Sequence, residues 1–131
     1  MKVCLDTNAY SAFKRGKSRL TEILESAEEV LVPAIVLGEL HAGFQTGDRA
    51  ERNTRELEEF LRRPGVLIAE VDRRVAERYG LLFKALKAVG RPVPTNDLWI
   101  AAAAVETGSR LLSDDAHFDY IPGVFRLTGR D

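Results

Sequence analysis

Four carboxylates stand where a purely structural sequence does not favour acidic side chains. They are Asp6, Glu39, Asp97 and Asp115. Two of them follow apolar runs that predict buried strands, and two lie on or beside the apolar side of segments with helical periodicity. Burying an unpaired carboxylate costs on the order of several kcal/mol, and the sequence has no matching row of inward-facing Lys or Arg. A divalent cation would neutralise such a group.

Each acid taken singly also has a structural explanation. Asp6 can cap a helix or close an Asx-turn, and residues 114–115 can simply form a turn. Asp97 can interact with the positive N-terminal end of its helix, and Glu39 can be a partly exposed residue on a helix flank. Only the combination of the four acids distinguishes a site from these alternatives.

Apolar runs alternate with segments of helical periodicity along the whole chain, which predicts a parallel sheet between layers of helices. The expected strands are the run ending at Leu5, then 30–32, 66–69, 111–113 and 124–127. The expected helices are 8–14, 18–27, 34–46, 49–63, 72–89 and one that contains the alanine-rich run 97–105. Gly108 is expected to end this last helix. Residues 90–96 contain two prolines and a glycine and are expected to be non-helical, and residues 114–120 are expected to form a turn or short helix. We therefore expect one α/β/α domain over residues 1–131.

This architecture predicts that the four acids converge. Asp6 and Asp115 follow strands, whereas Glu39 and Asp97 are expected in the first turns of helices entered from the carboxyl edge of the sheet. In parallel α/β sheets those positions lie along one edge, where ligands bind.

The predicted cluster consists of hard oxygen ligands without paired His or Cys, which suits Mg²⁺ or Mn²⁺ rather than zinc. Such ions work with phosphates, so the cluster points to phosphodiester hydrolysis by one ion or by two ions about 4 Å apart. No P-loop or glycine-rich dinucleotide motif competes, and neither His41 nor His117 has an obvious nucleophile partner. With Asp6 assigned to the site, Thr7 and Asn8 keep the role of capping the first helix.

The composition carries no general bias toward nucleic acid. The 19 basic and 20 acidic residues give a net charge of −1, whereas nucleic-acid binders are usually basic. However, 14 of the basic residues are Arg, whose guanidinium can hold a phosphate with two hydrogen bonds. The candidate phosphate contacts are Lys14, Arg15, Lys17 and Arg19, with Arg49, Arg52 and Arg55 as further candidates; a solvated loop explains the first group equally well.

The single cysteine, Cys4, excludes an internal disulfide, supplies no zinc cluster, and is expected to be buried in the first strand. No apolar run approaches the roughly 18 residues of a membrane span, and we expect no signal peptide. We expect a cytoplasmic protein with no membrane segment.

The same residues resemble the motifs of a known family. The chain is similar over essentially its full length to the PIN domain and, within it, to the VapC-type toxin ribonucleases of type II toxin–antitoxin systems. The motifs are Val3-Cys4-Leu5-Asp6-Thr7-Asn8, Gly38-Glu39-Leu40, Asn96-Asp97-Leu98-Trp99-Ile100-Ala101-Ala102, Leu112-Ser113-Asp114-Asp115, and the closing His117-Phe118-Asp119 with Ile121-Pro122-Gly123-Val124. The ordered set at this spacing, rather than any single motif, carries the resemblance.

The resemblance implies a PIN-like three-layer fold with a central, mostly parallel five-stranded sheet. It also implies an Mg²⁺- or Mn²⁺-dependent endoribonuclease acting on a structured RNA such as tRNA, rRNA or mRNA. Asp6 and Asp97 would hold the metal directly, and Glu39 and Asp115 would complete the set directly or through water. The residues expected behind these ligands, positioning water or phosphate, are Thr7, Asn8, Ser113, Asp114 and Asp119.

One departure from the family pattern concerns the fourth acid. Where the family usually has a basic or hydroxyl residue before that acid, this chain has Asp114. Asp114, Asp115 and Asp119 are therefore alternatives for the fourth ligand, and Asp115 is preferred.

The implied partners are a VapB-like antitoxin, which lays a peptide across the active-site groove, and a second copy of the chain in a homodimer. The apolar residues that could form such contacts, or could simply pack on the sheet, are Phe13, Leu20, Ile23, Leu24, Leu57 and Phe60. The alternatives are a PIN nuclease of RNA maturation or DNA cleavage without an antitoxin, and a non-catalytic PIN-fold binding module. A receiver-like phosphoacceptor domain fits poorly, because no lysine follows Lys87.

Overall fold

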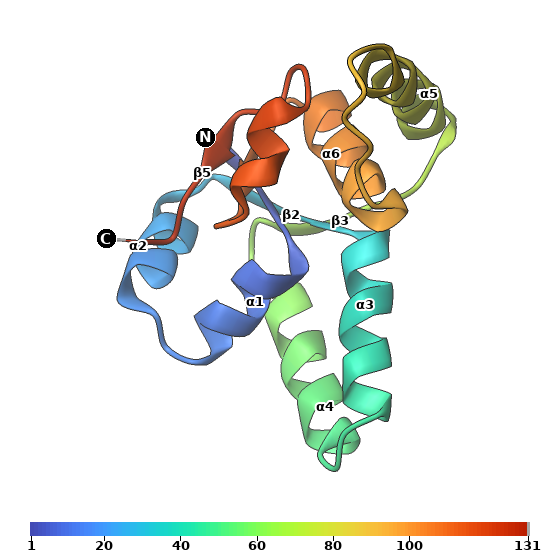
Figure 1. Cartoon of the computed structure of the whole chain (residues 1–131). Helices are drawn as coiled ribbons and strands as arrows, with labels where there is room; N and C mark the ends of the chain where they lie inside the picture. Colours follow the sequence, from blue (N-terminus) through green and yellow to red (C-terminus); the bar gives the residue numbers. More distant parts are fainter. Residues whose placement is uncertain (131) are drawn as a thin grey trace.

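Five short apolar runs form one sheet in the computed structural model of the protein, which describes residues 1–130 (Figure 1). Every neighbouring pair of strands is parallel, and the order is β3-β2-β1-β4-β5. The strands are β1 (Lys2–Leu5), β2 (Glu29–Pro33), β3 (Val66–Ala69), β4 (Arg110–Leu112) and β5 (Arg126–Leu127). The central strand β1 is the most deeply buried, with no exposed surface on Val3, Cys4 or Leu5, as expected for a strand covered on both faces.

The register places the carboxyl ends of β1 and β4 side by side. Leu5 pairs with Leu112, and the backbone N–H of Asp6 donates a 3.3 Å hydrogen bond to the carbonyl of Leu112. The polar residues that follow these two strands therefore meet at one edge of the sheet, although more than a hundred residues separate them along the chain.

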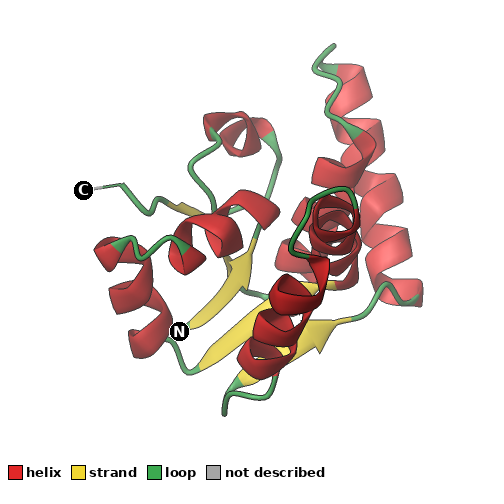
Figure 2. Cartoon of the chain, turned by 90° about the horizontal axis from the view of Figure 1, so that it is seen from below, coloured by secondary structure: helices red, strands yellow, loops and turns green. Residues whose placement is uncertain are grey.

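Helices flank the sheet, as Figures 1 and 2 show. Helix α5 packs against α6, α3 against α4, and α1 against α2. The helices are α1 (Thr7–Lys14), α2 (Ser18–Ser26), α3 (Ala34–Gln45), α4 (Ala50–Leu61), α5 (Arg73–Ala88), α6 (Thr95–Thr107) and the short 3-10 helix η1 (Ala116–Tyr120). The α/β/α architecture is confirmed. Within residues 1–130, no helix is long and apolar enough to cross a membrane.

Several boundaries differ from expectation by one or two residues, including those of α6 and β5. Helix α6 begins at Thr95, so the prediction that residues 90–96 are non-helical was wrong for Thr95 and Asn96. Proline restricts its own φ and the residue before it, so the helix can begin directly after Pro94. The closing strand is shorter than 124–127, because only Arg126 and Leu127 pair with β4.

Candidate active site

Asp6 is the N-cap of α1, and its side chain is only 6% exposed. Its Oδ1 accepts a 2.7 Å hydrogen bond from the backbone N–H of Ala9. The prediction that Thr7 and Asn8 would cap this helix was therefore wrong. The helix begins at Thr7, immediately after the strand, and the residue before a first helical turn is the one whose side chain reaches its free N–H groups.

Asp6 carries a charge that its surroundings disfavour. Burial raises the pKa of this carboxyl, with the Ser113 hydroxyl and the Ala9 N–H partly opposing, while the negative charges of Asp114 and Asp97 raise it further. A nearby cation would stabilise the ionised form of this carboxyl.

Glu39 is held by two donors from distant segments. The Thr7 hydroxyl donates a 2.6 Å hydrogen bond to its Oε1, and the Asn96 side-chain amide donates a 3.3 Å hydrogen bond to its Oε2. The sequence predicted Glu39 in the first turn of its helix. This was wrong, because α3 begins at Ala34 and Glu39 therefore lies in the second turn. Glu39 still reaches the edge, since both of its donors lie at the start of helices that begin there.

Asp97 lies in the first turn of α6, as the sequence predicted. Burial raises the pKa of its carboxyl, and the negative charges of Asp115 and Glu39 raise it further, while His117 opposes the shift. The fold thus brings together acids from the end of β1, α3, α6 and the segment after β4.

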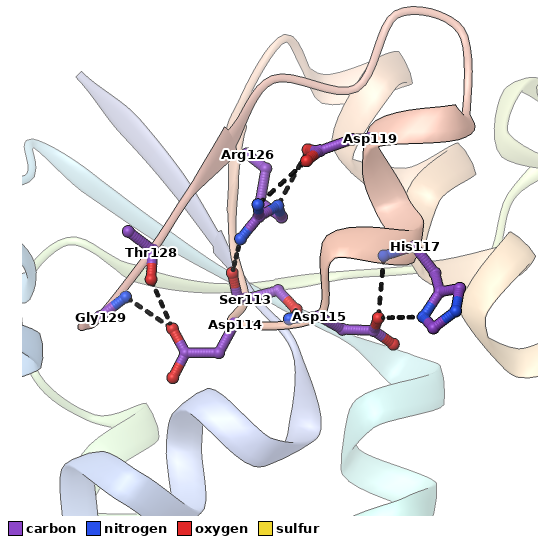
Figure 3. Close-up of polar contacts among 8 residues, drawn as sticks. All are labelled: Ser113, Asp114, Asp115, His117, Asp119, Arg126, Thr128 and Gly129. Atoms are coloured by element: carbon purple, nitrogen blue, oxygen red, sulfur yellow. Dashed lines mark hydrogen bonds and ion pairs between the residues drawn. The ribbon is translucent and has the colours of Figure 1, made fainter.

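Three aspartates follow β4 within seven residues, and the fold gives each a different partner (Figure 3). Asp114 accepts hydrogen bonds from the Thr128 hydroxyl (2.8 Å) and the Gly129 N–H (2.9 Å). The Thr128 bond is the main cause that lowers the pKa of Asp114. Asp114 is thus bound to the C-terminal segment.

Asp119 and Asp115 also have separate hydrogen-bond partners. Arg126 holds Asp119 with two hydrogen bonds, from Nε (2.9 Å) and Nη2 (3.0 Å), and lowers the pKa of that carboxyl. Asp115 accepts from the backbone N–H of His117 (2.9 Å) and lies 2.7 Å from its Nδ1, and these contacts lower its pKa. Both His117 contacts use Oδ1, and Asp115 shares a pocket wall with Asp97. These contacts favour Asp115 as the fourth acid.

Arg126 is a residue that sequence reasoning missed. Its side chain is only 19% exposed, and Nη1 donates a 3.0 Å hydrogen bond to the backbone carbonyl of Ser113 (Figure 3). The signal was an arginine inside the apolar closing run 124–127, a single inward-facing basic residue that the search for a matching row of Lys or Arg overlooked. Its charge is paired with Asp119, and it is not among the groups that shift the pKa of Asp6 or Asp97.

Residues 3–124 match the PIN domain family. The chain belongs to this family. Among curated proteins it is 33% identical to Ribonuclease VapC4 of Mycobacterium tuberculosis over 97 residues, covering 74% of this chain and 75% of the relative. It is 30% identical to Ribonuclease VapC2 of Haemophilus influenzae over 117 residues, which cover 88% of this chain and 87% of the relative. This PIN domain is therefore of the VapC type.

Solved structures agree with this assignment. The VapBC2 complex of Rickettsia felis bound to a DNA fragment from its promoter contains a chain with a TM-score of 0.87 and 25% identity, with 98% of each chain covered. The DNA-bound VapBC of Salmonella typhimurium contains a chain with a TM-score of 0.86 and 27% sequence identity, with 99% of each chain covered. The expected PIN fold is confirmed, and its sheet is parallel throughout.

The remaining predicted residues of this PIN domain lie at different distances from the acids. Ser113 is buried, and its hydroxyl accepts a 3.0 Å hydrogen bond from the backbone N–H of Asp115. Asn8 is exposed and lines a small pocket of about 100 Å³ with Ser113, Asp114 and Arg15. Asn8, Ser113 and Arg15 thus share one small pocket beside Asp114.

The other predicted phosphate contacts are not gathered at the acids. Lys14 ends α1 and forms an ion pair with Glu56 of α4 at 3.7 Å. Arg19 pairs with Glu22 on the exposed surface of α2, and Lys17 precedes that helix as its N-cap. An eight-residue helix is about 12 Å long, so the C-terminal end of α1 is remote from its Asp6 cap.

The acids of this PIN domain form an open arrangement rather than a closed cage. Within residues 1–130, no three His, Cys, Asp or Glu side chains lie close enough to hold one ion together. Mg²⁺ usually keeps several waters and uses one or two carboxylates together with substrate phosphates, so an open set of oxygen donors suits it. The buried Cys4 thiol, whose pKa burial raises to about 12, supplies no competing thiolate. Burial, and after it neighbouring carboxylates, raises the pKa values of Asp6 and Asp97, and a bound cation would favour their ionised forms.

Proposed function

We propose that this chain is an Mg²⁺- or Mn²⁺-dependent endoribonuclease and the toxin of a toxin–antitoxin pair. The observation that carries the proposal is the convergence of four acids from four separate elements at one edge of the sheet. Two of these acids, Asp6 and Asp97, have pKa values raised by burial and by neighbouring carboxylates. The curated relatives bear the name ribonuclease, which supports RNA as the substrate.

We assign the direct metal contacts to Asp6 and Asp97, with Asp115 and Glu39 acting directly or through water. When bound, the ion supplies an activated water and stabilises charge on the reacting phosphate. Each of three acids is oriented by its own donor: Asp6 by Ala9, Glu39 by Thr7, and Asp115 by His117. Because these carboxylates are already held in place, they need to move little when the substrate binds. Without a cation the same acids would repel a phosphodiester, so we expect cleavage to depend on the ion.

We also propose a VapB-like antitoxin as partner, since the similar solved structures include VapBC complexes. The expected apolar contact residues need correction. Leu20, Ile23, Leu24, Leu57 and Phe60 are each at most 8% exposed and belong to the core, and only Phe13 is partly buried at its margin. Large exposed apolar side chains lie elsewhere, including Leu81 and Phe83 on α5. The homodimer remains a proposal.

The test is cleavage of cellular RNA by purified, antitoxin-free protein with and without Mg²⁺ or Mn²⁺. We expect cleavage that chelation abolishes and that Asp6→Asn or Asp97→Asn reduces by at least about 100-fold. Asp48→Asn, an exposed acid in the turn before α4, is the matched control and should retain activity. An inactive wild type, or an Asp6→Asn variant as active as wild type, would refute the assignment. Equal cleavage of single-stranded DNA would favour the alternative of a DNA nuclease.

A further inference from the structure

A pocket of about 420 Å³ opens directly beside the acids, a volume typical of small-ligand sites. Its walls come from residues 91–94, the first turn of α6 and the 3-10 helix η1. Asp97 and Asp115 line one part of it, and Arg91 and Tyr120 line another. The pocket is therefore continuous with the proposed catalytic acids, although its aromatic part has no role in metal binding.

The aromatic part contains two flat groups that are stacked on each other and can extend the stack to a third. The Arg91 guanidinium lies over the Tyr120 ring, 4.1 Å from its centroid, and the Tyr120 side chain is 53% exposed. Within residues 1–130, Arg91 forms no ion pair with an acid. Tyrosine rings and guanidinium planes are the side chains on which single-stranded bases stack.

The charge of the pocket selects against a phosphate inside it. Asp97 and Asp115 repel an anion that enters the pocket unless a cation is bound to them, whereas a nucleobase is neutral and aromatic. His117 offers a polar contact at the same wall, because Asp115 engages its Nδ1 at 2.7 Å and leaves Nε2 for a base edge or a 2′-hydroxyl.

We propose that this pocket holds an unpaired nucleobase of the RNA, from the nucleotide beside the cleaved phosphodiester, stacked on Tyr120 and Arg91. The inference rests on the proposed ribonuclease function and adds a substrate requirement to it. The nucleotide's phosphate would lie at the acids while its base enters the pocket, so the enzyme requires an unstacked base at the cleavage position. Stacking tolerates every base, so the preference among bases is modest.

The test is binding of short single-stranded RNAs that carry 2-aminopurine at one position, in Mg²⁺ buffer. The protein carries Asp6→Asn, which we expect to slow cleavage at least about 100-fold and which lies outside the pocket lining. We expect stacking to quench the fluorophore, Tyr120→Ala to weaken binding about 5- to 150-fold, and Tyr120→Phe to retain it. Phe125→Ala is the matched control, because Phe125 is a 73% exposed aromatic outside the pocket.

Equal binding by the Tyr120→Ala and Tyr120→Phe variants would overturn the proposal. Displacement of the quenched RNA by arginine amide but not by nucleoside monophosphates would also overturn it and assign the pocket to a side chain of a protein partner. The two proposals fail separately. Wild-type cleavage that does not depend on Tyr120 removes the base pocket alone, whereas tight, Tyr120-dependent RNA binding without any wild-type cleavage removes the nuclease assignment.

Discussion

Thr7 and Glu39 are 32 residues apart in the chain, and the Thr7 hydroxyl donates a 2.6 Å hydrogen bond to the Glu39 carboxylate. This contact fastens α3 to the start of α1, where Asp6 caps the same helix. The side-chain amide of Asn96 on α6 reaches the other carboxylate oxygen. Glu39 is thus oriented from both sides of the site, and its role depends on residues that themselves need not touch metal or RNA.

Removing the Thr7 hydroxyl should release Glu39. We expect Thr7→Val to lower the cleavage rate about 10- to 100-fold, because partners that orient metal ligands have effects of that size. The free energy of unfolding should fall by only about 1 kcal/mol, the value of one partly exposed hydrogen bond. Thr7→Ser keeps the hydroxyl and is the control. Rates of RNA cleavage and urea unfolding curves measure both effects, and equal rates for Val and Ser would show that Glu39 needs no such support.

Arg126 should act on the site through position rather than contact. Its two hydrogen bonds to Asp119 and one to the Ser113 carbonyl connect β5 to the segment that carries Asp115. Arg126→Lys keeps the charge but cannot reproduce the planar fork, so we expect cleavage to fall about 10- to 100-fold.

The matched control is Arg130→Gln, which removes an exposed arginine with a single 3.7 Å ion pair to Asp114. Its cleavage rate and unfolding midpoint should equal those of wild type. A fully active Arg126→Lys variant would show that charge alone suffices at that position.

Asp114 and Asp115 are adjacent, yet their substitution should produce opposite phenotypes. Asp115→Asn should abolish cleavage with little change in stability, because Asp115 faces Asp97 and an amide oxygen can still accept the hydrogen bond from the His117 N–H. Asp114→Ala should leave most of the activity but reduce the free energy of unfolding by about 0.5–1 kcal/mol, since it releases Thr128 and Gly129 from a partly exposed contact. Parallel cleavage assays and urea unfolding of the two variants give the answer. The reverse pattern would make Asp114 the fourth acid.

The raised pKa of Asp6 predicts a stability difference that depends on pH. Below the ordinary carboxyl pKa near 3.8 the group is protonated in both folded and unfolded chains and has no effect. As pH rises, the unfolded chain ionises first, so the wild type loses stability until the pH exceeds the raised pKa of the folded state. Asp6→Asn should therefore be more stable than wild type near neutral pH. The advantage should shrink toward acid pH in unfolding curves measured with chelator, and an advantage that grows in acid would contradict the sign of this shift.

Mg²⁺ should reverse that order at neutral pH. An ion bound only to the folded protein stabilises the wild type by about 2.7 kcal/mol at 100 times its dissociation constant. Asp6→Asn and Asp97→Asn should show little of this effect, whereas the exposed-acid variant Asp48→Asn should show all of it. Protons compete for the same carboxylates, so the thermal shift should decline as pH falls. Equal shifts in all four proteins would place the ion elsewhere.

The local pattern of the sequence determined the layers of this fold and the identity of its acids. Apolar runs and helical stripes predicted every strand and helix to within a few residues, because burial on one or both faces imposes those periodicities. The motif order identified the PIN family, and the positions of Asp6 and Asp97 at the sheet edge follow from the chain's alternation of strand and helix.

Tertiary structure alone decided which polar groups meet. Asp114, Asp115 and Asp119 have the same side chain, and they differ because strand order places β5 beside β4 and so brings Thr128 to Asp114 and Arg126 to Asp119. The Thr7–Glu39 contact and the Arg91–Tyr120 pair likewise join segments far apart in sequence. The role of a carboxylate depends on which hydrogen-bond donors reach it. Here those donors come from segments distant in sequence, and local sequence patterns do not predict which distant segments meet.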